Sequence, residues 1–168
     1  MYKENFTNGS KFFANGVGLL TSGSGKEFDV MACEWTFNVS YNPFLVAVLV
    51  NPKHYTYKLL LRNPEFGITV ASVEQAALTH FAGTSTGSTT DKFKQFRIHL
   101  LKSKHIKPPL IKGGVFSAEC KVVKKVKIGD HVMFVGKVVR CLTDESKQPL
   151  LYRSGKFHHL GKKINRKK

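Results

Sequence analysis

The residues best suited to chemistry in this sequence are a cation and hydroxyls placed together at one predicted helix start. Lys53, His54, Tyr55 and Thr56 open a leucine-rich segment that predicts a short helix over residues 55–63. Free backbone N–H groups and the positive end of a helix dipole favour a phosphate at such a place. Taken alone, the simpler interpretation is that Thr56 caps the helix and Lys53 is a solvated charge.

Two further segments carry polar groups at predicted turns. GTSTGSTT, residues 83–90, is either a flexible linker or a loop whose amides and hydroxyls face a ligand. Its position between two predicted helices inside one domain favours the loop. Gly129-Asp130 lies between two predicted strands and is typical of a hairpin turn. His131 opens the second of these strands, where a histidine is often only a surface residue with satisfied hydrogen bonds.

Signatures of several other chemistries are missing from the sequence. It contains no G-x-G-x-x-G after a strand, no P-loop, no H-E-x-x-H and no G-x-S-x-G elbow between a strand and a helix, since GTSTG at residues 83–87 lies between two predicted helices. The seven histidines follow no recurring ligand spacing, so we predict no metal site. The cysteines are odd in number and lack C-x-x-C spacing, which argues against a disulfide framework or structural zinc. We interpret Cys33, Cys120 and Cys141 as buried thiols.

Short runs rich in β-branched and aromatic residues predict about six strands, bounded by Gly, Asn or Pro. Residues 44–50 are apolar on both faces, as expected for a strand in the middle of a barrel. Residues 115–122 alternate, so Ser117, Glu119 and Lys121 are predicted to face water. Gly136 predicts a bulge or a close approach of another backbone. The predicted strands are residues 17–21, 30–38, 44–50, 66–72, 115–122 and 131–142.

Helical patterns are fewer. The helix over residues 55–63 should stop before Pro64, and another over residues 72–81 should end at Gly83. A third, over residues 90–101, begins with Thr90 and Asp91, both suitable caps. We therefore predict a mainly β fold, a barrel with short inserted helices. It forms a single domain over residues 1–168, with a basic, frayed tail from about residue 161.

Composition limits the partners of the chain. Its 168 residues, 42% of them hydrophobic, suffice for one core. The chain has 27 Lys and Arg residues against 11 Asp and Glu residues, and its net charge of +16 predicts an anionic partner. The longest apolar run is far below the ~18 residues of a membrane span, and no secretion signal is evident, so we expect a cytoplasmic protein without a membrane partner. Basic clusters at residues 102–107, 121–127 and 161–168 lack the aromatic interleaving of nucleic-acid platforms, and solvated faces explain them more simply.

Three segments stand in a characteristic order along most of the chain. MACEWTFNVSYNPFLVAVLV, residues 31–50, is followed by PKHYTYKLL with its Thr56. TSTGSTTDKF, residues 84–93, runs a Gly/Ser/Thr loop into Asp-Lys-Phe. AECKVVKKVKIGDHVMFVGKVV, residues 118–139, contains Gly-Asp-His followed by F-x-G-x-V. In their order and spacing these segments resemble the flavin reductase-like, FMN-binding split-barrel family.

This resemblance implies a Greek-key split β-barrel that binds FMN, takes NAD(P)H as co-substrate and forms a homodimer with the flavin near the subunit interface. FMN needs a dry groove, backbone hydrogen bonds and a cluster of positive or N–H donors. In the family the flavin ring lies along the first segment, and the phosphate fits the predicted helix start. The implied cofactor contacts are Ala32, Cys33, Glu34, Trp35, Thr36, Asn38, Ser40, Lys53, His54, Tyr55, Thr56, Ser85 and Lys92.

Several of these positions keep two interpretations. Trp35 either stacks on the flavin or is a half-buried barrel aromatic. Glu34 departs from the small or hydroxyl residue common in the family, and a carboxylate there would disfavour an anionic reduced flavin. Ser85 and Lys92 either contact the cofactor or belong to a solvated helix start. By resemblance His131 is the candidate for orienting NAD(P)H, and because hydride passes directly to the flavin it transfers no proton.

Three functions remain for comparison. The leading one is an NAD(P)H-dependent flavin reductase that passes electrons to free flavin, an iron complex or a partner protein such as a monooxygenase. The second is an FMN-binding electron carrier without NAD(P)H activity of its own. The third is a basic β-barrel that binds single-stranded nucleic acid, whose binding would weaken steeply with salt.

Overall fold

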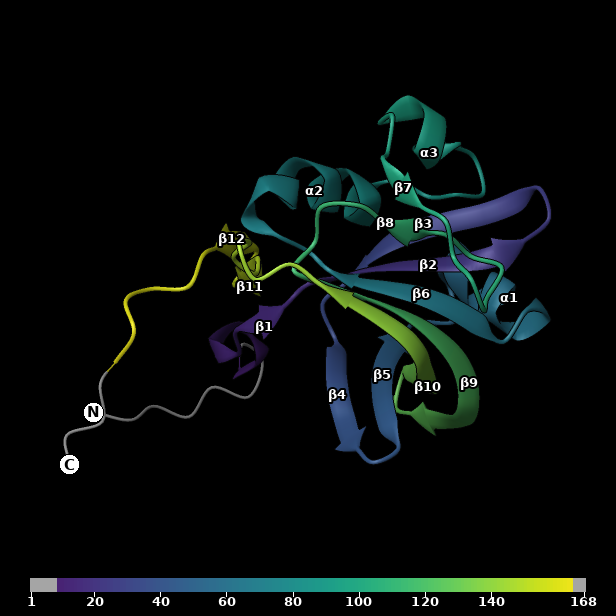
Figure 1. Cartoon of the computed structure of the whole chain (residues 1–168), viewed down its shortest axis with the longest axis horizontal. Coiled ribbons are helices and arrows are strands. Elements are labelled where there is room, and N and C mark those ends of the chain that lie inside the picture. Colours follow the sequence, from purple (N-terminus) through teal and green to yellow (C-terminus); the bar gives the residue numbers. More distant parts are fainter. Residues whose placement is uncertain (1–8, 165–168) are drawn as a thin grey trace.

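The protein, seen in a computed structural model, is described over residues 9–164, in which its strands form one large and two small sheets (Figure 1). The large sheet has the order β3-β2-β6-β9-β10-β5-β4, with every neighbouring pair antiparallel. The strands are β1 Asn15–Gly16, β2 Gly18–Ser24, β3 Glu27–Cys33, β4 Thr36–Tyr41, β5 Phe44–Val50, β6 Glu65–Val70, β7 Leu100–Leu101, β8 Leu110–Ile111, β9 Phe116–Ile128, β10 His131–Thr143, β11 Leu151–Arg153 and β12 Lys156–His158. The helices are η1 Gly9–Phe12, α1 Tyr55–Arg62, η2 Val73–Gln75, α2 Ala76–Thr84 and α3 Lys92–Gln95.

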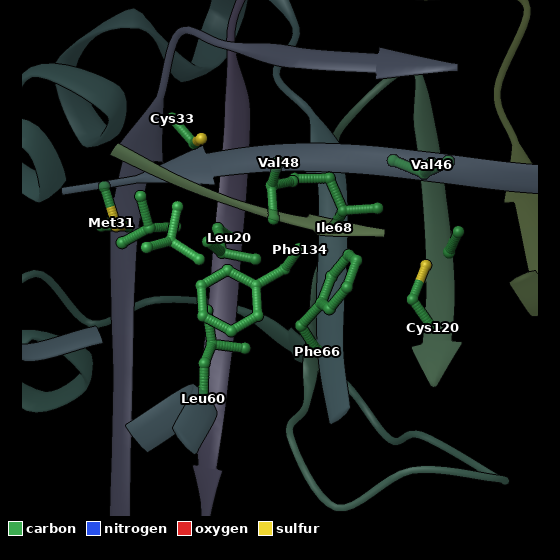
Figure 2. Close-up of a cluster of buried hydrophobic side chains, with 13 residues drawn as sticks. Leu20, Met31, Cys33, Val46, Val48, Leu60, Phe66, Ile68, Cys120 and Phe134 are labelled. Atoms are coloured by element: carbon green, nitrogen blue, oxygen red, sulfur yellow. The ribbon is translucent and has the colours of Figure 1, made fainter. Parts of the chain in front are cut away.

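The large sheet curves around one apolar core. Figure 2 shows Leu20, Phe66 and Phe134 pointing into it from three strands, with Leu60 of α1 closing one side. Gly136 lies at a register shift between β9 and β10, and a Cβ there would come within 2.5 Å of the Phe66 ring. The predicted bulge at Gly136 is therefore confirmed, whereas its close neighbour is the Phe66 side chain rather than another backbone. The mainly β fold with short helices is also confirmed.

A second apolar cluster packs α2 against β3. Leu78 and Ala82 of α2 contact a buried group that includes Leu19 and Val30 from β2 and β3. Phe93, at the start of α3, packs against the same cluster. Both α2 and α3 therefore pack against β3, the edge strand of the large sheet, beside which Figure 1 draws them.

Two predicted elements end earlier than expected. The strand predicted over residues 30–38 is broken, because β3 ends at Cys33 and the next strand starts at Thr36, whose hydroxyl donates to the Cys33 carbonyl at 3.0 Å. The two pieces lie at opposite edges of the large sheet. The helix predicted over residues 90–101 is only the short α3, which ends before Arg97 at φ 51°. Its predicted cap Asp91 is confirmed and accepts from the Lys94 N–H at 3.1 Å.

The predicted water-facing side of residues 115–122 is partly wrong. Ser117 and Glu119 are buried, because the segment over residues 103–111 covers that face of the sheet. The Glu119 carboxylate accepts from the Arg140 guanidinium at 2.7 Å and from two backbone N–H groups of the covering segment, at 2.9 and 2.6 Å. Cys141 is likewise exposed rather than buried, unlike Cys33 and Cys120.

The C-terminal end of the described chain has no regular secondary structure. Residues 161–164 are exposed and belong to no helix or strand, and the rest of the predicted basic tail, 165–168, lies outside the described residues. No helix within residues 9–164 has the length and apolar character required to cross a membrane.

Candidate functional site

A cavity of about 290 Å³ brings together three segments that are far apart in the sequence. One wall comes from β3, a second from the start of α1, and a third from the end of α2 with the loop that follows it. Many of the lining side chains carry hydroxyls or charges. The lining residues are Asp29, Met31, Ala32, Lys53, His54, Tyr55, Thr56, Ala82, Gly83, Thr84, Ser85, Thr86 and Lys92.

The start of α1 presents unused donors to this cavity. Its N-cap is His54, in extended conformation, and within residues 9–164 this side chain makes no cap hydrogen bond. The first N–H groups of a helix have no partner inside the helix, and the residues that carry them, Tyr55 and Thr56, line the cavity. Lys53 is exposed beside them. The interpretation of Thr56 as a helix cap is wrong, because its hydroxyl donates to the Asp29 Oδ2 atom at 2.7 Å.

The Gly/Ser/Thr segment is a folded loop. The helix α2 passes its predicted end at Gly83 and finishes at Thr84. Ser85 then caps it, since its N–H and its hydroxyl both donate to the Phe81 carbonyl, at 3.1 and 2.6 Å. The N–H groups of residues 89 and 90 return to the Thr86 carbonyl. The hydroxyl of Ser85 is therefore committed to the helix end, although the residue lines the cavity.

Lys92 lies at the base of the cavity as an internal cation. Its ammonium is 3.0 Å from Asp29 Oδ1, and both side chains are only 2% exposed. It also donates to the Val30 carbonyl at 2.7 Å and to the Ala82 carbonyl at 3.3 Å. Lys92 is thus balanced by a carboxylate, and the exposed cation of the cavity is Lys53.

A second cavity, of about 770 Å³, lies around Trp35 and is more apolar. The Trp35 ring, 39% exposed, stands 4.6 Å from the His131 ring at an angle of 52°. Glu34 accepts from the Asn15 side-chain amide at 3.0 Å at the border of this space. A smaller cavity of about 220 Å³ shares Glu34 with it and Ala32 with the polar cavity. The three spaces therefore adjoin along the end of β3.

The hairpin turn between β9 and β10 lies close to the start of α1, with His131 directly after the turn and His54 directly before the helix. Burial lowers the pKa of His54, and the charges of His131 and Lys92 lower it further, against the opposing effect of Asp29. His131 Nδ1 is 2.8 Å from the Asp130 carboxylate, and this hydrogen bond lowers the pKa of Asp130. The predicted Gly129-Asp130 turn joins β9 to β10, with Gly129 at φ 56°. His131 thus lies next to Trp35 and near the α1 wall.

Some of the implied contacts lie elsewhere. The Cys33 thiol is buried against the Trp35 and Leu49 carbonyls, and burial raises its pKa to about 11. Asn38 lines a different cavity, of about 510 Å³, which reaches Val46 and Ile68 of the barrel core. Ser40 follows on the same edge strand. The break after Cys33 places Thr36, Asn38 and Ser40 on β4, at the opposite edge of the large sheet from β3. They do not line the polar cavity, and their role as contacts of the flavin ring or ribityl chain stays a prediction.

Some lining residues carry no motif that sequence reasoning could use. Asp29 falls in a stretch whose composition predicts a turn, and Ala82 has the character of an ordinary core residue, whereas Met31 opens the segment that resembles the family's flavin groove. Thr84 and Thr86 do belong to the loop whose composition indicates a ligand. Within residues 9–164, no group of three or more His, Cys, Asp and Glu side chains is placed to hold a metal ion.

Comparison with known proteins defines the class. The chain belongs to the flavin reductase like domain family, which it matches over residues 10–161. This confirms the resemblance predicted from its three segments. Within 121 residues it is 40% identical to an uncharacterized protein of Pyrococcus abyssi, covering 72% of this chain and 69% of the other.

Two characterised proteins are more distant. An NADH-dependent FAD reductase of Streptomyces globisporus is 27% identical over 146 residues, covering 86% of this chain and 79% of the reductase. The solved structure of BorF, the flavin reductase component of a bacterial two-component tryptophan halogenase, superposes with a TM-score of 0.80 at 26% identity. That match covers 90% of this chain and 93% of BorF.

Proposed function

We propose that this protein is an NAD(P)H-dependent flavin reductase that binds FMN in the polar cavity and the space beside Trp35. The observation that carries the proposal is the convergence of β3, the α1 start and the 84–86 loop on one cavity, with Trp35 and His131 in contact next to it. Membership of the flavin reductase like family supports it.

The residues present fit the chemistry of FMN. The unused N–H groups at the α1 start and the exposed Lys53 suit a phosphate dianion. The exposed Thr86 hydroxyl, 3.0 Å from Ser88 Oγ, suits a polyol, whereas the Thr84 hydroxyl already donates to the His80 carbonyl at 2.9 Å. The polar cavity and its smaller neighbour together reach the range of roughly 300–1,000 Å³ that cofactor sites occupy. Asp29, the carboxylate that would repel a phosphate, is already paired with Lys92.

The chain contributes binding and orientation to the reaction. When bound, the flavin supplies the acceptor for hydride. Trp35 and His131 form an aromatic wall against which a nicotinamide can be oriented, and Asp130 fixes the His131 ring through Nδ1. The lining near Trp35 is mostly apolar, so a nicotinamide ring seated there would displace water from this space. Because distance and alignment are what hydride transfer requires, no side chain needs to move a proton.

The test is spectroscopic and kinetic. Purified protein given FMN should retain it and absorb at about 450 nm, a property of flavins in general, and should oxidise NAD(P)H. His131→Ala should abolish NAD(P)H turnover while FMN stays bound, whereas the exposed His99→Ala should change neither. A protein that binds no FMN would contradict the proposal. Bound FMN without NAD(P)H turnover in the unmodified chain would instead identify the electron carrier.

The electron acceptor and the oligomer belong to the same proposal. Free flavin, an iron complex or a monooxygenase partner would receive the electrons.

We expect a homodimer, supported by the apolar edge strand β4, on which Phe37, Val39 and Tyr41 are all exposed. Phe37→Asp should convert the dimer to a monomer in sedimentation analysis. A chain that is monomeric before the substitution would contradict the homodimer.

A further inference from the structure

A buried ion pair lies between the walls of the candidate cavity. Asp29 of β3 and Lys92 at the start of α3 are both 2% exposed, and Asp29 Oδ1 faces the ammonium at 3.0 Å as a charge contact without hydrogen-bond geometry. Taking two charges out of water is costly, and apolar residues of similar volume are often no less stable. The pair is therefore poorly explained by stability alone.

Lys92 connects one wall of the cavity to the sheet. The Val30 carbonyl that it bonds belongs to β3, the edge strand, where alternate carbonyls have no strand partner. The Ala82 carbonyl belongs to the last turn of α2, where carbonyls lack partners inside the helix. One ammonium thus holds the start of α3 and the end of α2 against β3.

Asp29 connects the opposite wall to the same point. Its second oxygen, Oδ2, accepts from the Thr56 hydroxyl in the first turn of α1 at 2.7 Å. Gly87 of the loop covers the carboxylate, because a Cβ at this position would meet Asp29 Oδ1 and come within 3.0 Å of the Tyr55 ring. The carboxylate therefore holds the α1 start while the 84–91 loop closes over it.

We infer that Asp29 and Lys92 are a positioning pair that sets the separation between the α1 wall and the 82–86 wall before flavin binds. This inference rests on the proposed function. Both side chains are buried, so they act through Thr56, Ala82 and the loop. A site held in its bound shape loses less free energy on binding. Loss of the pair should therefore weaken flavin affinity more than turnover at saturating flavin.

The first experiment compares two lysines of the same short helix. Lys92→Met removes the buried cation, and Lys94→Met makes the same charge change at a side chain that is 89% exposed. FMN binding, followed by fluorescence, should weaken roughly tenfold or more in Lys92→Met, the scale on which outer partners of a site act. NAD(P)H turnover at saturating FMN should be retained. Lys94→Met should match the unmodified protein in both.

The second experiment removes both charges. Asp29→Asn/Lys92→Met leaves no unpaired buried charge, so it should fold even if Lys92→Met does not. It should bind FMN more weakly than the unmodified protein and more tightly than Lys92→Met, a non-additivity expected only of groups that interact. A purely structural pair would lower the thermal unfolding temperature and leave the affinity of the folded protein unchanged.

Hydrogen exchange tests the pair without flavin. Amides of residues 84–91 should exchange faster in Lys92→Met, or in the double variant, and at the original rate in Lys94→Met. Unchanged exchange would overturn the inference, as would FMN affinity in the double variant equal to that of the unmodified protein. These results differ from failure of the proposed function, in which the unmodified protein itself binds no FMN.

Discussion

Two buried carboxylates in the large sheet hold loops against it, at different places and with different consequences. Asp29 on β3 holds the α1 start and, through Lys92, the end of α2. Glu119 on β9 holds Arg140 and the backbone of residues 104 and 105. Of the described residues that line the candidate cavity, several contact the Asp29 pair and none belongs to β9. A buried carboxylate therefore shapes the candidate cavity at Asp29, whereas at Glu119 it stabilises the segment that covers the sheet.

The two carboxylates are both buried, but their cationic partners differ in access to water. Lys92 is as buried as Asp29, whereas Arg140, the partner of Glu119, is 22% exposed. Although burial raises the pKa of Glu119, the Arg140 side chain and two backbone N–H donors together lower it below its usual value. Glu119 is therefore ionised across the neutral range and stabilises the fold there.

The largest effect should come from Glu119→Ala. The substitution leaves Arg140 and two backbone N–H groups without their acceptor, a loss of about 3–5 kcal/mol for a broken buried pair. Urea unfolding measures this loss. The folded variant should bind FMN as tightly as the unmodified protein, and weaker binding would contradict the separation between the two regions.

Two glycines sharpen the same comparison. A Cβ at Gly67, beside the segment that covers Glu119, would come within 2.9 Å of the Pro109 carbonyl. A Cβ at Gly87 would meet Asp29. Each Gly→Ala change should lower the free energy of unfolding by about 1–3 kcal/mol through overpacking. Only Gly87→Ala should also weaken FMN binding, measured by the same fluorescence titration. Equal losses of FMN affinity in the two variants would contradict the distinction between the Asp29 region and the Glu119 region.

Local signals predict some elements well and others badly. The strand over residues 44–50 is observed with the same bounds, and the helix predicted over 55–63 is observed over 55–62. Both are predicted well because Asn-Pro dipeptides, which interrupt regular structure, stand at their ends in the sequence. Glu119 is predicted to face water since its strand alternates, yet a segment from another part of the chain covers it. Burial by a distant segment leaves no mark in local periodicity.

The residues of the candidate site likewise differ in how well the sequence predicts them. Lys53 and Thr56 follow from a helix start and a family resemblance, and both line the cavity. Asn38 and Ser40 lie away from the polar cavity because the chain breaks after Cys33, where the sequence has no Gly or Pro to indicate a turn. Asp29 carries no signal of its own. Its role depends on Lys92, 63 positions further along the chain, and only the fold brings the two together.

Acid should weaken the contribution of Glu119 to stability. The lowered pKa of Glu119 means that its contribution to stability is complete above the ordinary glutamate pKa of about 4.3 and is lost as pH falls through the lower folded value. Unfolding free energies measured between neutral pH and about pH 3 should therefore fall less steeply in Glu119→Gln than in the unmodified protein. An identical pH dependence would show that Glu119 is not the group responsible.

The smallest effect should come from an exposed ion pair on the same helix that Asp29 holds. Arg62, in the last turn of α1, is 2.8 Å from Glu27, and both side chains are 59% exposed. Exposed pairs contribute about 0–1 kcal/mol, so Arg62→Met should barely change urea unfolding and should leave FMN affinity unaltered. If it weakened FMN binding as much as Lys92→Met, any disturbance of α1 would suffice, and burial of the Asp29 pair would no longer explain the shape of the site.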